Sequence, residues 1–170
     1  MIKFFKRIFN DMILFFKDRD YYNRRQNYLK LQKIARKKMC KASKEFCPWS
    51  GWYMHEMVKI MLGFYYETYT AGDCCWSTQE RLDRIAESIK EALDYAYKLE
   101  ELDYMSSKEL LHHAYNDSGF VEYLAEWEKE FGQKYERDDL YAGLAEEYFT
   151  QKYTAAMYEA IGKHIWEWCD

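Results

Sequence analysis

Residues 77–102, STQERLDRIAESIKEALDYAYKLEEL, decide the fold of this chain. The stretch opens with a capping box, in which the side chains of Ser77 and Glu80 reciprocally satisfy backbone amides at the start of a helix. Apolar residues then recur at every third or fourth position, namely Leu82, Ile85, Ala86, Ile89, Leu93, Ala96 and Leu99. This spacing is typical of a helix that buries one face. We therefore predict a helix over 78–102 whose apolar side is covered by other helices.

Similar patterns on both sides of this stretch predict further helices. They cover about 2–18, 21–45, 52–70 and 120–135, with a short helix from a capping box at Ser106–Glu109 to Tyr115 and a last one from Asp138 to Trp168. One proline and seven glycines in 170 residues leave little room for many strands and turns. The prediction is an all-α fold, a single-domain bundle of about six helices over residues 1–170.

The charges of the chain are unevenly distributed. Residues 1–47 hold 14 of the 25 Lys and Arg residues and 4 of the 29 Asp and Glu residues, which gives them a net charge of +10. The remaining residues, 48–170, therefore hold 11 cations and 25 anions, a net charge of −14. We expect a basic N-terminal pair of amphipathic helices over 1–47 and an acidic helical remainder over 48–170.

The first predicted helix is strongly amphipathic. One half of its wheel carries Ile2, Phe4, Phe5, Ile8, Phe9, Met12, Ile13, Phe15 and Phe16. The pattern breaks at Arg19 and Asp20, which predicts a bend or a change of packing partner near there. We expect the apolar face to join the core, with Phe5, Phe9, Met12 and Phe16 buried.

The second predicted helix carries a basic stripe at helical spacing, made of Lys30, Lys33, Lys37 and Lys41. Three interpretations are open. The lysines could contact phosphates of a nucleotide or nucleic acid while Tyr21, Tyr22 and Tyr28 stack on bases. The first helix could lie on an anionic bilayer. We favour a third interpretation, in which the cations pair with the acidic remainder, within the chain or across a dimer.

Motifs for catalysis or metal binding are weak in this sequence. Glu109 and His112 have the ExxH spacing of di-metal bundles, but no second copy occurs, and Glu109 already has a capping role. Cys74 and Cys75, with Cys47 or His55, could bind zinc, although buried structural cysteines are the favoured interpretation. No glycine-rich phosphate loop, GxSxG or HExxH is present. A Cys/His nucleophile pair stays open; we expect no enzyme, no cofactor and no metal.

The location of the protein is suggested by two features. The five cysteines are odd in number and lack CxxC spacing, which favours a reduced, intracellular protein. The longest uncharged apolar run near the start, residues 12–16, is five residues long, against roughly 20 for a membrane span. We expect a chain that neither crosses a membrane nor carries an export signal.

Three segments resemble a known group of proteins: FFKDRDYY at 15–22, RLDRIAESIKEALDYAYKLEELDY at 81–104, and HIWEWCD at 164–170. They are similar to small α-helical proteins of unassigned function that tailed phages encode. The resemblance implies a phage accessory protein in the cytoplasm of a bacterial host. It also implies action by binding, either to block a host enzyme or defence complex or to sequester a signalling nucleotide.

The leading hypothesis is a non-enzymatic binding protein, a homo-oligomer, that modulates or inhibits a host protein through aromatic and charged surface. The 17 tyrosines exceed what a helical core needs and favour exposed or interfacial positions for some of them. A nucleotide- or nucleic-acid-binding protein is the first alternative, and a peripheral membrane-surface protein is the second and less favoured one. The candidate binding residues are Tyr21, Tyr22, Tyr28, Lys30, Lys33, Lys37, Lys41, Trp166 and Trp168.

Overall fold

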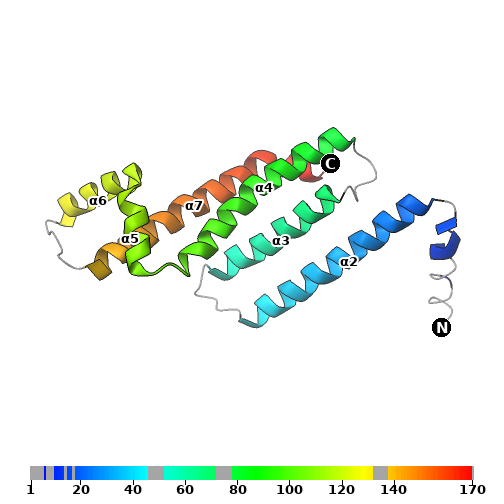
Figure 1. Cartoon of the computed structure of the whole chain (residues 1–170), viewed down its shortest axis with the longest axis horizontal. Helices are drawn as coiled ribbons and strands as arrows, with labels where there is room; N and C mark the ends of the chain where they lie inside the picture. The colour runs from blue at the N-terminus through cyan, green and yellow to red at the C-terminus, as the bar shows by residue number, and fades with distance from the viewer. Residues whose placement is uncertain are drawn as a thin grey trace. The chain divides into compact units, whose positions relative to one another are not determined.

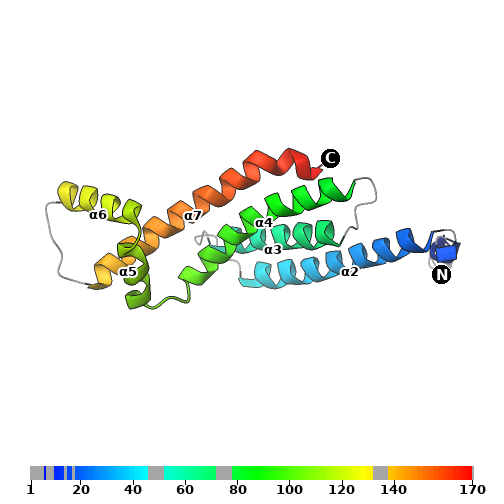
Figure 2. The ribbon, with the colours of Figure 1, turned by 45° about the horizontal axis from the view of Figure 1, so that its top comes forward.

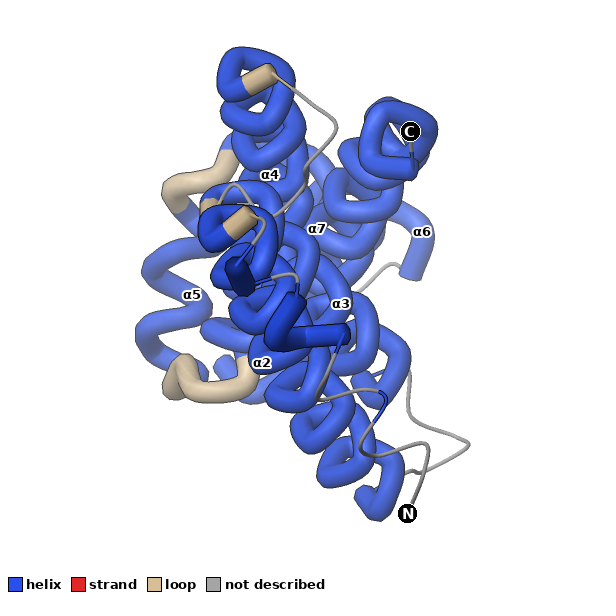
Figure 3. Tube along the Cα trace, turned by 90° about the vertical axis from the view of Figure 1, so that its right-hand side faces the viewer, coloured by secondary structure: helices blue, strands red, loops and turns tan. Residues whose placement is uncertain are grey.

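The structure, a computed structural model, describes residues 6, 10–13, 15–16, 18–45, 52–71, 78–131 and 138–169. Across these residues the backbone forms helices and short turns, and no strand occurs in the described ranges (Figure 3). The predicted all-α fold class is confirmed.

The helices follow the predicted ranges closely. In chain order they are α2 (Arg19–Ala42), the short 3-10 helix η1 (Ser43–Glu45), α3 (Trp52–Thr70), α4 (Gln79–Leu102), α5 (Ser107–Tyr115), α6 (Ser118–Phe131) and α7 (Asp138–Cys169) (Figure 1). Most of the predicted helix over 2–18 lies outside the described residues, but 10–13 and 15–16 are helical.

Side chains at the helix starts explain several boundaries. Asp18 has an extended backbone, and its side chain accepts a hydrogen bond from the amide of Tyr21 at 2.9 Å, so α2 begins anew where the sequence predicted a bend. The capping box of Ser106 and Glu109 is confirmed at the start of α5. At the start of α4, Ser77 lies outside the described residues, and Thr78 Oγ1 accepts from the amide of Arg81 at 3.4 Å.

The chain divides into two compact units. The first comprises Met1–Glu91 and Lys163–Asp170, and the second comprises Ala92–Gly162. Within the first unit α2 and α3 run side by side (Figure 2), and the rings of Tyr28 and Phe64 lie 5.7 Å apart between them. The organisation as a single domain stays a prediction.

The first unit buries a tryptophan near the end of α7. The indole Nε1 of Trp168 donates to Ser88 Oγ at 2.8 Å, and Ser88 Oγ donates in turn to the carbonyl of Ile85 at 2.8 Å. The hydroxyl of Tyr69 donates to the carbonyl of Trp168 at 2.5 Å. These buried polar atoms therefore have partners, which removes the penalty for taking them out of water.

The second unit has an aromatic core. The rings of Phe120 and Phe149 are fully buried and stack with centroids 6.3 Å apart. The core cluster consists of Leu102, Leu110, Ala114, Phe120, Leu144, Ala145 and Phe149. Stacked or edge-on aromatic pairs of this kind add stability beyond the area that they bury.

Asp117 ties α6 to α7 within the second unit. Its Oδ1 accepts from the amide of Phe120 at 3.1 Å and from the hydroxyl of Tyr148 at 3.2 Å, and its Oδ2 accepts from Lys152 Nζ at 2.5 Å. Because Asp117 caps the helix, α6 begins at Ser118 rather than at the predicted residue 120. The hydrogen bond from Lys152 holds the pKa of Asp117 below its usual value, and the same bond raises the pKa of Lys152.

The lowered pKa of Asp117 predicts a pH-dependent contribution to stability. A carboxyl group whose pKa is lower in the folded state stabilises the fold above its unfolded pKa of about 3.9, and this stabilisation is lost as the pH falls through the folded pKa. We expect Asp117→Asn to lower the free energy of unfolding by about 1 kcal/mol at neutral pH and by much less in acid. Urea titrations across this pH range measure the difference.

Glu122→Gln is the matched control, because Glu122 is an exposed carboxylate on the same helix. Its effect should be small and nearly independent of pH. If Asp117→Asn lowers the free energy of unfolding by the same amount at every pH down to the lowest, the charge of Asp117 does not stabilise the fold.

Candidate anion-binding surface

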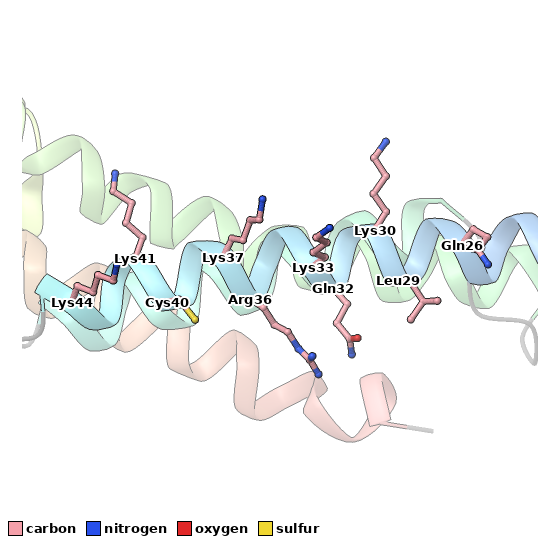
Figure 4. Close-up of a pocket in the computed structure, with 10 residues that line it drawn as sticks. All are labelled: Gln26, Leu29, Lys30, Gln32, Lys33, Arg36, Lys37, Cys40, Lys41 and Lys44. Atoms are coloured by element: carbon pink, nitrogen blue, oxygen red, sulfur yellow. The ribbon is translucent and has the colours of Figure 1, made fainter. Parts of the chain in front are cut away.

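Cationic side chains gather along one side of α2. We call Lys30, Lys33, Lys37, Lys41 and Lys44 the basic face; Lys44 lies in η1, directly after α2. Their steps of three and four residues place them near one another on a helix of 3.6 residues per turn. They border an open groove of about 850 Å³ (Figure 4), whose lining residues are Gln26, Leu29, Lys30, Gln32, Lys33, Arg36, Lys37, Cys40, Lys41 and Lys44.

The five cations of the basic face are exposed, and their side chains form no ion pair or hydrogen bond with any residue that the structure describes. Elsewhere on the same helix, Arg25 does lie 3.8 Å from a carboxylate oxygen of Asp11. Pairing of the stripe with the acidic remainder, the favoured interpretation, is not seen among the described residues of this chain, and pairing across a dimer stays a prediction. Like charges four residues apart repel by a few tenths of a kcal/mol, roughly 0.2–0.5, so the face keeps a charge that a partner could neutralise.

The tyrosines do not join the basic face. At about 100° per residue, Tyr28 lies about 160° around the helix from Lys30, and Tyr21 about 180°. Tyr28 packs towards α3 against Phe64, and the ring of Tyr22 meets the ring of Phe15 edge-on at 5.4 Å. The expected combination of lysines on phosphates with these tyrosines on bases is therefore not assembled here.

The two tryptophans near the end of α7 have opposite environments. Trp166 is 80% exposed, whereas Trp168 is 7% exposed and hydrogen-bonded in the core of the first unit. The assignment of Trp168 to a binding surface is therefore wrong, and Trp166 stays a candidate. Two residues apart on a helix are about 200° apart in direction, so the spacing alone already argued against a shared face.

A second surface feature was not expected from the sequence. We call Met12, Ile13, Phe15 and Phe16 the apolar patch; they are 49%, 39%, 39% and 79% exposed. The expected burial of Met12 and Phe16 is wrong, and Phe5 and Phe9 lie outside the described residues. The apolar half of the helical wheel was visible in the sequence, but the wheel cannot show whether another element covers it.

The described residues offer no metal site. No group of three or more His, Cys, Asp or Glu side chains comes together among them in a way that could hold a metal ion. Glu109 is engaged by its own cap, where its carboxylate accepts from the amide of Ser106 at 2.9 Å. Cys47, Cys74 and Cys75 lie outside the described residues, so the zinc alternative stays untested.

Among the helices that the structure describes, none combines the length and the hydropathy that a membrane crossing requires. No family model, no curated protein and no solved structure matches this chain.

Proposed function

We propose that this protein acts by binding, without catalysing a reaction, and that the basic face of α2 contacts an anionic partner. One observation carries the proposal: five lysines share one exposed helical face, and none is neutralised by a described residue. A cationic surface of this kind attracts anionic partners and releases their counterions on contact.

The local structure supports this role. The helix α2 spans 24 residues, and its packing against α3 holds the basic face in one direction. Lys41 lies in the last turn, where the negative end of the helix dipole stabilises cations. The cations are therefore held on a regular scaffold, which lowers the entropy lost on binding.

Charge reversal of the basic face provides the test. We expect Lys33→Glu, Lys37→Glu and Lys41→Glu together to weaken binding to heparin, a general polyanion, at least tenfold at low salt. The binding of the unchanged protein should fall steeply, about a hundredfold, as salt rises from 50 to 200 mM, because about four contacts release counterions. The slope of affinity against salt should be shallower for the variant.

A control variant with the same change in charge separates the basic face from net charge. Lys108→Glu, Lys129→Glu and Lys163→Glu alter three exposed lysines on α5, α6 and α7. This variant should keep most of the affinity for heparin. An equal loss of affinity for heparin in both triple variants would contradict a role for the basic face.

Further parts of the sequence interpretation stay predictions. Engagement of a host protein could use Trp166, whose exposed indole suits a partner's pocket. The homo-oligomer, the cytoplasmic location and the phage setting implied by the resemblance remain part of the proposal.

A further inference from the structure

We propose that the anionic partner of the basic face is the surface of a phospholipid bilayer, which the protein contacts with the basic face and the apolar patch together. This inference rests on the proposed function and deepens it by naming the partner. Three observations carry it: the contacts that Asp11 and Phe15 make with α2, the side of α2 on which those contacts lie, and the kinds of side chain on the two surfaces.

The apolar patch is held against the first turns of α2. The carboxylate of Asp11 lies 3.8 Å from the guanidinium of Arg25. The ring of Phe15 lies 5.4 Å from the ring of Tyr22, and the guanidinium of Arg19 is 5.9 Å from the centroid of Phe15. Residues early in this segment thus meet later positions of α2, so the segment doubles back along the helix.

The segment attaches along the flank of α2 beside the basic face. On the helical wheel Arg19 lies within about 20° of Lys30, Tyr22 about 80° and Arg25 about 140° from it, all in the same rotational direction. The opposite side of α2 is occupied by α3, as the contact between Tyr28 and Phe64 shows. The patch therefore borders the basic face near the N-terminal end of α2, and both surfaces are exposed.

A bilayer surface matches this combination. Anionic headgroups neutralise lysines that approach within a Debye length, while the boundary below them takes up apolar side chains such as Phe16. Phe16 is exposed to water in the free protein, so its insertion removes apolar surface from water. The electrostatic contact of the lysines and the insertion of the apolar side chains therefore favour the same orientation of the protein on the bilayer.

A nucleic acid fits the surface less well. Its phosphates would meet the lysines, but bases bind through stacking on aromatic rings placed beside the cations. Tyr21 and Tyr28 lie on the far side of α2 from Lys30, and Tyr22, about 80° from Lys30, already packs its ring against Phe15. A phosphate backbone offers nothing apolar to the patch. Nucleic-acid binding is therefore treated as an outcome of the test.

Vesicle sedimentation of the full chain tests the inference. We expect binding to vesicles of mixed phosphatidylglycerol and phosphatidylcholine to be at least tenfold stronger than binding to phosphatidylcholine alone. Met12→Ser with Phe16→Ser should weaken binding to the anionic vesicles about tenfold and leave heparin binding unchanged. The triple reversal of Lys33, Lys37 and Lys41 should weaken both.

A matched control changes an exposed aromatic and an exposed aliphatic side chain elsewhere. Tyr104→Ser with Val121→Ser removes such side chains from the second unit and should leave vesicle binding unchanged. Far-UV circular dichroism of each variant checks that its helices are intact.

The outcomes separate the two proposals. If the protein binds heparin through the basic face but shows no preference for anionic vesicles, the bilayer proposal is overturned and the proposed function stands. Tighter binding to a single-stranded oligonucleotide than to vesicles would have the same meaning. An affinity for anionic vesicles that is unchanged in the variant with Met12→Ser and Phe16→Ser would also overturn the bilayer proposal. If the triple reversal of Lys33, Lys37 and Lys41 changes neither heparin binding nor vesicle binding, the proposed function itself is overturned.

Discussion

Phe149→Ala is expected to lower the free energy of unfolding by about 3–5 kcal/mol, since it removes a large ring from a filled core. The ring is fully buried. It stacks on Phe120 at 6.3 Å and on Tyr153 at 5.6 Å, and the imidazole of His113 lies 4.6 Å from it. The neighbours come from α5, α6 and α7. Because three helices line the cavity that alanine would leave, a shift of one helix alone cannot close it.

Urea unfolding followed by circular dichroism measures this loss. Tyr158→Ala is the control on the same helix, because Tyr158 is exposed, and it should change stability by no more than about 0.5 kcal/mol. Similar midpoints for the two variants would mean that Phe149 does not pack in the second unit as described.

Trp168→Ala is expected to destabilise the first unit by about 3–5 kcal/mol. The loss combines a buried indole with the hydrogen bond from its Nε1 to Ser88 Oγ at 2.8 Å. Ser88 keeps its own bond to the carbonyl of Ile85, and Tyr69 keeps its bond to the backbone carbonyl at residue 168. Trp168→Phe, which retains most of the ring and removes the N–H, should cost only about 1 kcal/mol beyond a small change in packing.

Trp166→Ala is the internal control for this prediction. The same residue type, two positions away on the same helix, is 80% exposed. Its loss should alter stability by less than about 0.5 kcal/mol in the same urea titration. A larger loss for Trp166→Ala than for Trp168→Ala would reverse the assignment of the two indoles.

Helix positions were predictable from the sequence because local rules set them. The apolar spacing over 78–102 and the box at Ser106–Glu109 act within one or two turns, so no knowledge of distant contacts was needed. The start of α6 was placed two residues late. There the sequence Asn116–Gly119 indicated only a turn, and the capping by Asp117 was not distinguished from it.

The candidate surface was predictable only in part. The four lysines of the stripe from Lys30 to Lys41 follow from helical spacing and are all exposed, and the structure adds Lys44 to the same face. Which tyrosines face another helix, and which of Trp166 and Trp168 is buried, depend on the helices that pack beside them. The exposure of Phe16 likewise depends on whether another element covers it, and amphipathic spacing carries no information on that point.

The two hydrogen bonds of Trp168 also bear on the order in which the protein folds during synthesis. They join residues 80 and 99 positions apart in the chain, whereas the second unit is one continuous stretch from Ala92 to Gly162. The ribosome therefore completes the second unit before it has made the last piece of the first. Domains generally fold from the N-terminus onwards as they emerge, but here Tyr69 and Ser88 can form these hydrogen bonds only after Trp168 has been translated, 99 and 80 residues later.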